Sequence, residues 1–131
     1  MNFKEFCESM EKKIVDSYES GVTLVEAEKL AGEFLYAQIR VSDQLKTADL
    51  DSRMRKSGLK AIRAALYLDA CSKADKKPTE AQLTAMLDTN EIVAAEQNSF
   101  DEAEVKRDAM DRYYNIFQSA HVYFRQLSRG Q

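Results

Sequence analysis

Apolar residues recur every three or four positions along most of the chain, which predicts helices with one buried face. The first predicted helix covers residues 2–20 and ends before Gly21, a residue suited to a helix C-terminus. The second covers residues 23–46. It opens with Thr23 and Glu26, three positions apart, which is the spacing of a capping box.

A break is expected at residues 47–49, where Asp49 can cap the helix that follows. The third predicted helix then covers residues 50–72. After it comes a polar linker, residues 73–78, which ends in the chain's single proline. This linker is the clearest internal boundary of the sequence.

The fourth predicted helix begins at Thr79, with Gln82 completing a second capping box. Residues 88–90 are Asp, Thr and Asn, which favour helix caps over helix interiors and therefore predict an interruption. The last helix is expected to run from about residue 89 to residue 129, which is more than thirty residues.

Apolar side chains of this last helix follow an a/d pattern over roughly three heptads. A helix of such length can fold back into a bundle core or pack against other subunits, and the pattern leaves both alternatives open. The a/d residues are the candidate oligomer interface: Met110, Tyr113, Phe117, Ala120, Phe124 and Leu127.

The fold class that follows is all-α, a small helical bundle with a long C-terminal helix. One proline and four glycines in 131 residues leave little room for the tight turns of a β-rich fold. The chain is predicted to be a single domain, 1–131. Its N-terminal half, 1–72, contains the first three helices, and its C-terminal half, 79–131, serves oligomerisation.

Candidate catalytic and metal-binding residues are few. Cys7 and Cys71 are expected to be free thiols, with a single disulfide as the alternative, and they lack the ligand spacing of a zinc site. His121, the only histidine, is predicted to be a packing or surface residue, because no nucleophile accompanies it in a known motif. We therefore expect no enzyme activity, no metal and no cofactor.

Charge is distributed unevenly along the chain. The total is -3, with 19 basic against 22 acidic residues, which by itself argues against a polyanion as partner. Residues 53–77, however, contain eight basic residues against Asp69 and Asp75, a net charge of +6, and the rest of the chain carries -9. Net charge is therefore the wrong quantity for judging partners here.

The basic segment has a regular geometry. At about 100° per residue, its basic residues and one tyrosine form a helix stripe roughly 80° wide. Such a stripe can follow a phosphate backbone, with the tyrosine as a stacking surface for a base, or it can face an acidic protein. The candidate nucleic-acid-binding residues are Arg53, Lys56, Lys60, Arg63 and Tyr67.

Four stretches of the chain resemble, in order and spacing, the UvsY family of phage recombination mediators. The stretches are VTLVEAEKLAGEFLYAQI, RKSGLKAIRAALYLDA, PTEAQLTAMLDTNEIVAAEQ and AHVYFRQLSRG. The resemblance extends from about Thr23 to Gly130 and leaves the first helix without a counterpart. The family's long glycine-containing loop is replaced here by the shorter SKADKKP.

The second of these stretches resembles the family's DNA-binding helix. Lys60 matches the family's DNA-contacting lysine within the sequence LKA. The family's arginine is displaced by one position, because Ile62 intervenes before Arg63. Arg63 nevertheless belongs to the same stripe as Lys60.

The resemblance implies a recombination mediator that binds single-stranded DNA and helps to load a RecA-like recombinase in phage recombination and repair. It also implies a single-stranded-DNA-binding protein as partner and a ring-shaped homo-oligomer, a heptamer, built through the C-terminal helices. The expected location is the cytoplasm of an infected bacterial host. No apolar run approaches the ~18 residues of a membrane span, and the N-terminus lacks the apolar region of a secretory signal. The alternative is a helical oligomeric adaptor or regulatory phage protein that binds a protein partner.

Overall fold

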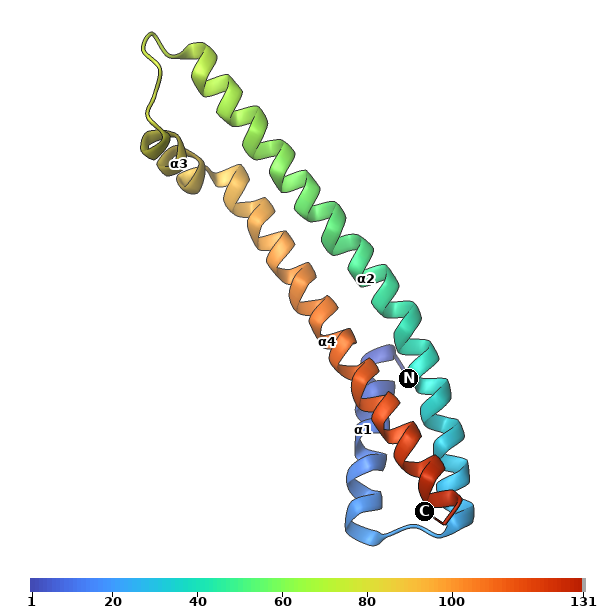
Figure 1. Ribbon diagram of the computed structural model, residues 1–131. Coiled ribbons are helices and arrows are strands. Elements are labelled where there is room, and N and C mark those ends of the chain that lie inside the picture. Colours follow the sequence, from blue (N-terminus) through green and yellow to red (C-terminus); the bar gives the residue numbers. More distant parts are fainter. Residues whose placement is uncertain (131) are drawn as a thin grey trace. The chain divides into compact units, whose positions relative to one another are not determined.

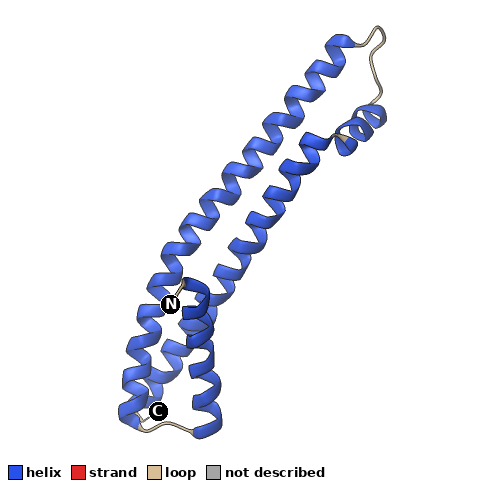
Figure 2. Cartoon of the chain, turned by 180° about the vertical axis from the view of Figure 1, so that it is seen from behind, coloured by secondary structure: helices blue, strands red, loops and turns tan. Residues whose placement is uncertain are grey.

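The structure is a computed structural model that describes residues 1–130. This part of the chain contains four helices: α1 (Phe3–Ser20), α2 (Leu24–Lys73), α3 (Glu80–Thr89) and α4 (Glu91–Ser128) (Figure 1). No strand occurs within residues 1–130 (Figure 2). The prediction of an all-α fold with a long C-terminal helix is confirmed.

The helices begin and end largely where the local sequence signals predict. The backbone N–H of Glu26 donates to Thr23 Oγ1 at 3.2 Å, and Thr79 and Gln82 form a reciprocal capping box. Asn2 forms a further box with Glu5 at the start of α1. These signals act within three residues, so they do not depend on distant parts of the chain.

The predicted break at residues 47–49 is wrong, because α2 continues through it as one helix of 50 residues. Ala48 is only 4% exposed, so it contributes to the buried face of the helix. Asp49 does not act as a cap; its carboxylate lies 3.1 Å from the guanidinium of Arg53, one turn later in the same helix. Burial and this i,i+4 pair both favour continuation of the helix.

The predicted interruption is confirmed at Asn90, whereas Asp88 and Thr89 still belong to α3. Helix α3 ends at Thr89, and α4 begins at Glu91. The side-chain oxygen of Asn90 accepts hydrogen bonds from the backbone N–H groups of Ile92 at 2.9 Å and Val93 at 3.2 Å. Asn90 therefore caps α4, as expected for this residue type.

The chain forms two compact units, each of which includes part of α2 and part of α4. The first unit consists of Met1–Lys46 and the chain from Asp108 onward, and the second unit is Thr47–Arg107. Each unit thus contains residues from both halves that flank the 73–78 linker.

The core of the first unit is formed by α1, α2 and α4. Phe34 is fully buried, and its ring centroid lies 5.8 Å from that of Phe117 and 5.5 Å from that of Phe124. Ala120 is also buried, and Tyr113 and Leu127 pack against this core.

The a/d pattern predicted these α4 residues, together with the half-buried Met110, as an oligomer interface. In the single chain most of them lie in the bundle core, which is the other alternative that the pattern left open. Their role between subunits stays a prediction.

The second unit has a smaller core. Leu59 of α2, Leu87 of α3 and Val93 of α4 are buried together, and Ile62 and Leu66 pack against them. The inward face of this part of α2 is therefore the face that carries Leu59, Ile62 and Leu66. The opposite face of the helix is exposed to solvent.

Two glycines should respond in opposite ways to the same substitution. Gly32 lies inside α2 with no atom within 4 Å of an added Cβ, so Gly32→Ala should raise the free energy of unfolding by about 0.5–1 kcal/mol. Gly21 has φ +73° and ψ 171°, a region almost restricted to glycine, so Gly21→Ala should lower that free energy by about 1–3 kcal/mol. Urea unfolding followed by circular dichroism measures both, and a change of the same sign in the two variants would contradict the assigned backbone conformations.

The two cysteines are free thiols, as predicted, and they should differ in reactivity. Burial raises the pKa of the Cys7 thiol to about 11, whereas Cys71 is partly accessible. Because the thiolate is the nucleophile, iodoacetamide at about pH 8 should label Cys71 in the native protein and Cys7 only after unfolding. Mass spectrometry of the labelled peptides measures this, and equal native labelling rates would contradict the burial of Cys7.

Candidate nucleic-acid interface

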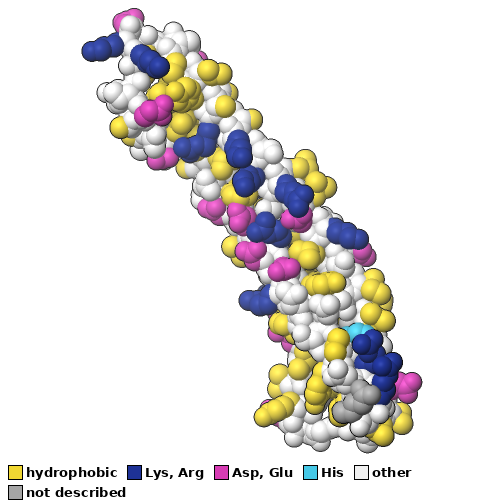
Figure 3. All heavy atoms as spheres, in the orientation of Figure 1, with side chains coloured by type: hydrophobic (Ala, Val, Ile, Leu, Met, Phe, Trp, Pro, Cys, Tyr) yellow, Lys and Arg dark blue, Asp and Glu magenta, His cyan; other side chains and the backbone are white. Residues whose placement is uncertain are grey.

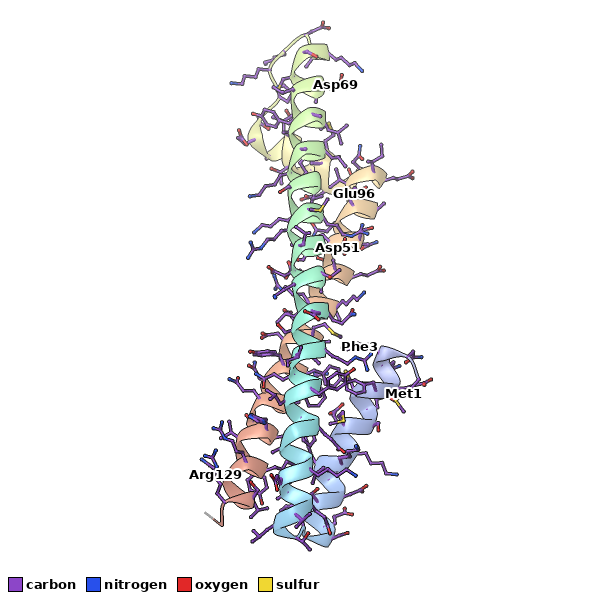
Figure 4. The ribbon with its side chains drawn as sticks, turned by 90° about the vertical axis from the view of Figure 1, so that its right-hand side faces the viewer. Met1, Phe3, Asp51, Asp69, Glu96 and Arg129 are labelled. Atoms are coloured by element: carbon purple, nitrogen blue, oxygen red, sulfur yellow. The ribbon has the colours of Figure 1, made fainter. Side chains whose placement is uncertain are left out.

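The five predicted stripe residues all lie on α2 in the second unit, in the stretch between the labelled Asp51 and Asp69 (Figure 4). Arg53, Lys56 and Lys60 are exposed, and Arg63 and Tyr67 are half-buried. Leu59 and Leu66 point into the core, so the stripe lies on a flank of the helix beside the buried face. Figure 3 shows Lys and Arg side chains gathered over this region, with carboxylates among them.

Four of the eight basic side chains between residues 53 and 77 pair with carboxylates. Three of these pairs join residues one turn apart on α2, and one joins α2 to α3. The pairs, with their N–O distances, are Arg53–Asp49 (3.1 Å), Arg55–Asp51 (3.3 Å), Lys73–Asp69 (3.1 Å) and Arg63–Asp88 (3.5 Å). All four pairs are solvent-accessible, so each contributes little to stability and can exchange one anion for another.

The other four basic residues are Lys56, Lys60, Lys76 and Lys77, and all are exposed. Within residues 1–130 these lysines form no ion pair. Lys56 and Lys60 lie on one face of α2, one turn apart, with an axial separation of about 6 Å. Lys76 and Lys77 lie in the connection from α2 to α3. The uncompensated positive charge of the segment is therefore concentrated in these four ammonium groups.

The C-terminal end of the stripe is in contact with α3. The Tyr67 hydroxyl donates to the Glu80 carboxylate at 3.4 Å, and this carboxylate raises the pKa of Tyr67. Asp88, near the other end of α3, pairs with Arg63. Within residues 1–130, the middle of the stripe, Lys56 and Lys60, is therefore without ion pairs. Arg53 at one end pairs with Asp49, and the other end contacts carboxylates of α3.

The sequence prediction does not include several features of this surface, among them its ion pairs. The predicted stripe also leaves out Lys76 and Lys77, although both belong to the basic segment. Arg63 contacts Asp88, 25 positions later, and Tyr67 contacts Glu80, 13 positions later. No local sequence pattern predicts contacts between residues so far apart.

Other candidate chemistry is placed elsewhere. His121 Nδ1 lies 2.8 Å from the carbonyl oxygen of Ala31, a contact that joins α4 to α2 within the first unit. No three His, Cys, Asp or Glu side chains of residues 1–130 are grouped so that they could hold a metal ion. In the same part of the chain, no helix combines the length and apolar character needed to cross a membrane.

A groove of about 960 Å³ lies in the first unit between α1 and α4. Its charged lining residues are Asp108, Asp111 and Arg112, and the rest of its lining is mostly apolar or uncharged. Two carboxylates against one guanidinium disfavour a polyanion. The basic surface of the second unit is therefore the better candidate for nucleic acid.

No family model, no curated protein and no solved structure matches the chain. The residues of this surface therefore carry the functional argument.

Proposed function

We propose that the chain binds single-stranded DNA through α2 of the second unit and acts as a recombination mediator without enzyme activity. The observation that carries the proposal is the group of four exposed lysines without ion pairs, Lys56, Lys60, Lys76 and Lys77. In this role the protein helps to load a RecA-like recombinase onto DNA coated by a single-stranded-DNA-binding protein. It does so as a homo-oligomer in the cytoplasm of an infected bacterial host.

Lysine side chains are well suited to contacts with a phosphate backbone. An ammonium group is a compact point charge on a flexible stem, without the planar fork that lets arginine read guanine. Lys56 and Lys60 therefore favour contacts that are indifferent to base sequence. Each such contact releases counterions, so binding should weaken steeply with salt.

The carboxylates around the stripe fit a protein that passes DNA to a second protein. Asp49 and Asp88 occupy two of its basic groups, and the whole chain is negatively charged. These groups limit affinity, because a bound phosphate competes with a carboxylate already in place. A mediator needs such moderate affinity, since its DNA must be released to the recombinase.

The direct test is a mobility-shift assay with a fluorescent oligo-dT and the wild-type protein. We expect a shift at about 50 mM salt that is lost as the salt concentration rises. Competition by unlabelled single strands of mixed sequence should be as effective as competition by oligo-dT. Binding that resists high salt would contradict the electrostatic interface.

The second candidate is an adaptor that binds an acidic protein surface. The pairing of Arg63 with Asp88 favours it, because part of the stripe already accepts carboxylates from another helix. Charge complementarity of this kind supports specific protein association. Absence of any DNA shift at low salt would favour the adaptor over the mediator.

A further inference from the structure

The second unit carries an exposed apolar face on α2, opposite the face that contains Leu59. Leu50, Met54 and Leu68 are 60%, 64% and 67% exposed. Four small exposed residues lie between the large ones on the same face: Ser57, Ala61, Ala64 and Ala65. At 100° per residue, the whole set falls within about 100° around the helix. Apolar side chains line the outer edge of α2 in Figure 3.

A helix that is packed on one side normally presents polar residues to solvent on the other. This part of α2 is apolar on two opposite faces. Helices α3 and α4 cover only the face of Leu59 and Leu66. Such a helix is typical of an element that is covered on both sides, and exposed apolar side chains that share one face can mark an interaction site.

The sizes of the side chains identify the partner. Met54 lies seven residues before Ala61, and Leu68 lies seven residues after it, so the order large–small–large is the same in both directions. Two helices that cross need small residues at the crossing point, where their axes approach to about 8 Å, and larger ones where they diverge. A second copy of the chain, running antiparallel, meets both requirements.

We propose that two copies of the protein pair through this face of α2, antiparallel, with Ala61 on the two-fold axis. Met54 of each copy then packs against Leu68 of the partner subunit, and the two Ala61 side chains meet at the crossing. The interface is isologous, the commonest form of self-association. Only Met54 and Leu68 pair as large apolar side chains, so the interface is small and we expect the pairing to be reversible.

The pairing changes the basic surface, a consequence that rests on the proposed function. Arg53, Lys56 and Lys60 flank the apolar face on one side of α2, at about 60–120° from Leu50. An antiparallel two-fold places the same flank of each copy on the same side of the dimer. The two lysine rows then form one longer surface for a single DNA strand.

This arrangement predicts opposite salt effects. Like charges on the adjoining flanks oppose pairing, so self-association should strengthen as salt screens them, while DNA binding weakens. Bound DNA neutralises the same charges, so it should promote pairing at low salt. Sedimentation velocity with and without oligo-dT measures both effects.

The decisive experiment is cysteine cross-linking in a Cys71→Ser background, in which the remaining Cys7 is fully buried. A disulfide requires Cβ atoms about 4 Å apart, which holds for a residue on the two-fold axis and for partners across it. Ala61→Cys should therefore cross-link to itself under oxidised glutathione. Met54→Cys alone and Leu68→Cys alone should not form the disulfide, because the same residue in the two copies lies about 21 Å apart along the helix axis. A mixture of the Met54→Cys and Leu68→Cys variants should form it.

Val105→Cys is the matched control, because Val105 is 70% exposed on α4 of the same unit but lies outside this face. No cross-link of Ala61→Cys, in a variant with native helicity by circular dichroism, overturns the proposal. Equal cross-linking of Met54→Cys, Leu68→Cys and Val105→Cys alone also overturns it. If the cross-links form in the predicted pattern but the protein binds no DNA, the pairing is supported and the proposed function is contradicted.

Discussion

Replacing Phe34 by alanine is expected to lower the free energy of unfolding by about 3–5 kcal/mol. Phe34 is fully buried in the first unit, between the rings of Phe117 and Phe124. Its removal takes away apolar burial and leaves a cavity that the stiff surrounding helices fill only in part. Because natural domains are stable by only about 5–15 kcal/mol, this one change should remove a large share of the total.

Urea unfolding followed at 222 nm measures the effect, with Leu35→Ala as the matched control. Leu35 is the next residue of the same helix, but it is 44% exposed and lies outside the core. The control should lose about 1 kcal/mol or less. Equal losses in the two variants would mean that Phe34 does not occupy the core position assigned to it.

Replacing Lys56 and Lys60 together by alanine is expected to weaken single-stranded DNA binding about 25-fold at 0.1 M salt. Each phosphate contact to a single strand contributes about 0.7 to the slope of log affinity against log salt, so two contacts contribute about 1.4. Neither lysine pairs with a carboxylate within residues 1–130, so no ion pair is lost with them. Helicity and stability should be unchanged, because both side chains are exposed.

The control for this variant is Lys4→Ala with Lys12→Ala, which removes the same charge from exposed positions of α1. Fluorescence anisotropy of a labelled oligonucleotide should show almost no loss for the control. Arg63→Ala should reduce affinity less than Lys60→Ala, because Arg63 already faces Asp88. If the control lost as much affinity as the Lys56 and Lys60 variant, net charge rather than a defined surface would account for binding.

The sequence predicted those parts of the fold that depend on neighbouring residues. The caps at Thr23, Thr79 and Asn90 are set by atoms within three residues, so their side chains sufficed to locate helix ends. The predicted break at residues 47–49 is wrong because Ala48 is buried in the folded chain, which no local signal reports. The a/d pattern of α4 described a real apolar seam, but it did not reveal that this seam packs against α1 and α2 of the same chain.

In the candidate site, too, the sequence predicted the features that depend on neighbouring residues and not those that depend on tertiary contacts. Helical periodicity placed Lys56 and Lys60 together on an exposed flank of α2, and the structure has them there. The i,i+4 pair of Arg53 with Asp49 could have been read from spacing alone. The contacts of Arg63 and Tyr67 with α3 could not, because they depend on how the chain turns back after residue 73.

The most direct test of the account is the salt dependence of wild-type binding to a single-stranded oligonucleotide. If the four lysines without ion pairs each contact a phosphate, the slope of log affinity against log salt should be close to -2.8, at about -0.7 per contact. Anisotropy titrations between about 50 and 300 mM salt give this slope. A slope near zero, or no binding at the lowest salt, would contradict the assignment of this surface to single-stranded DNA.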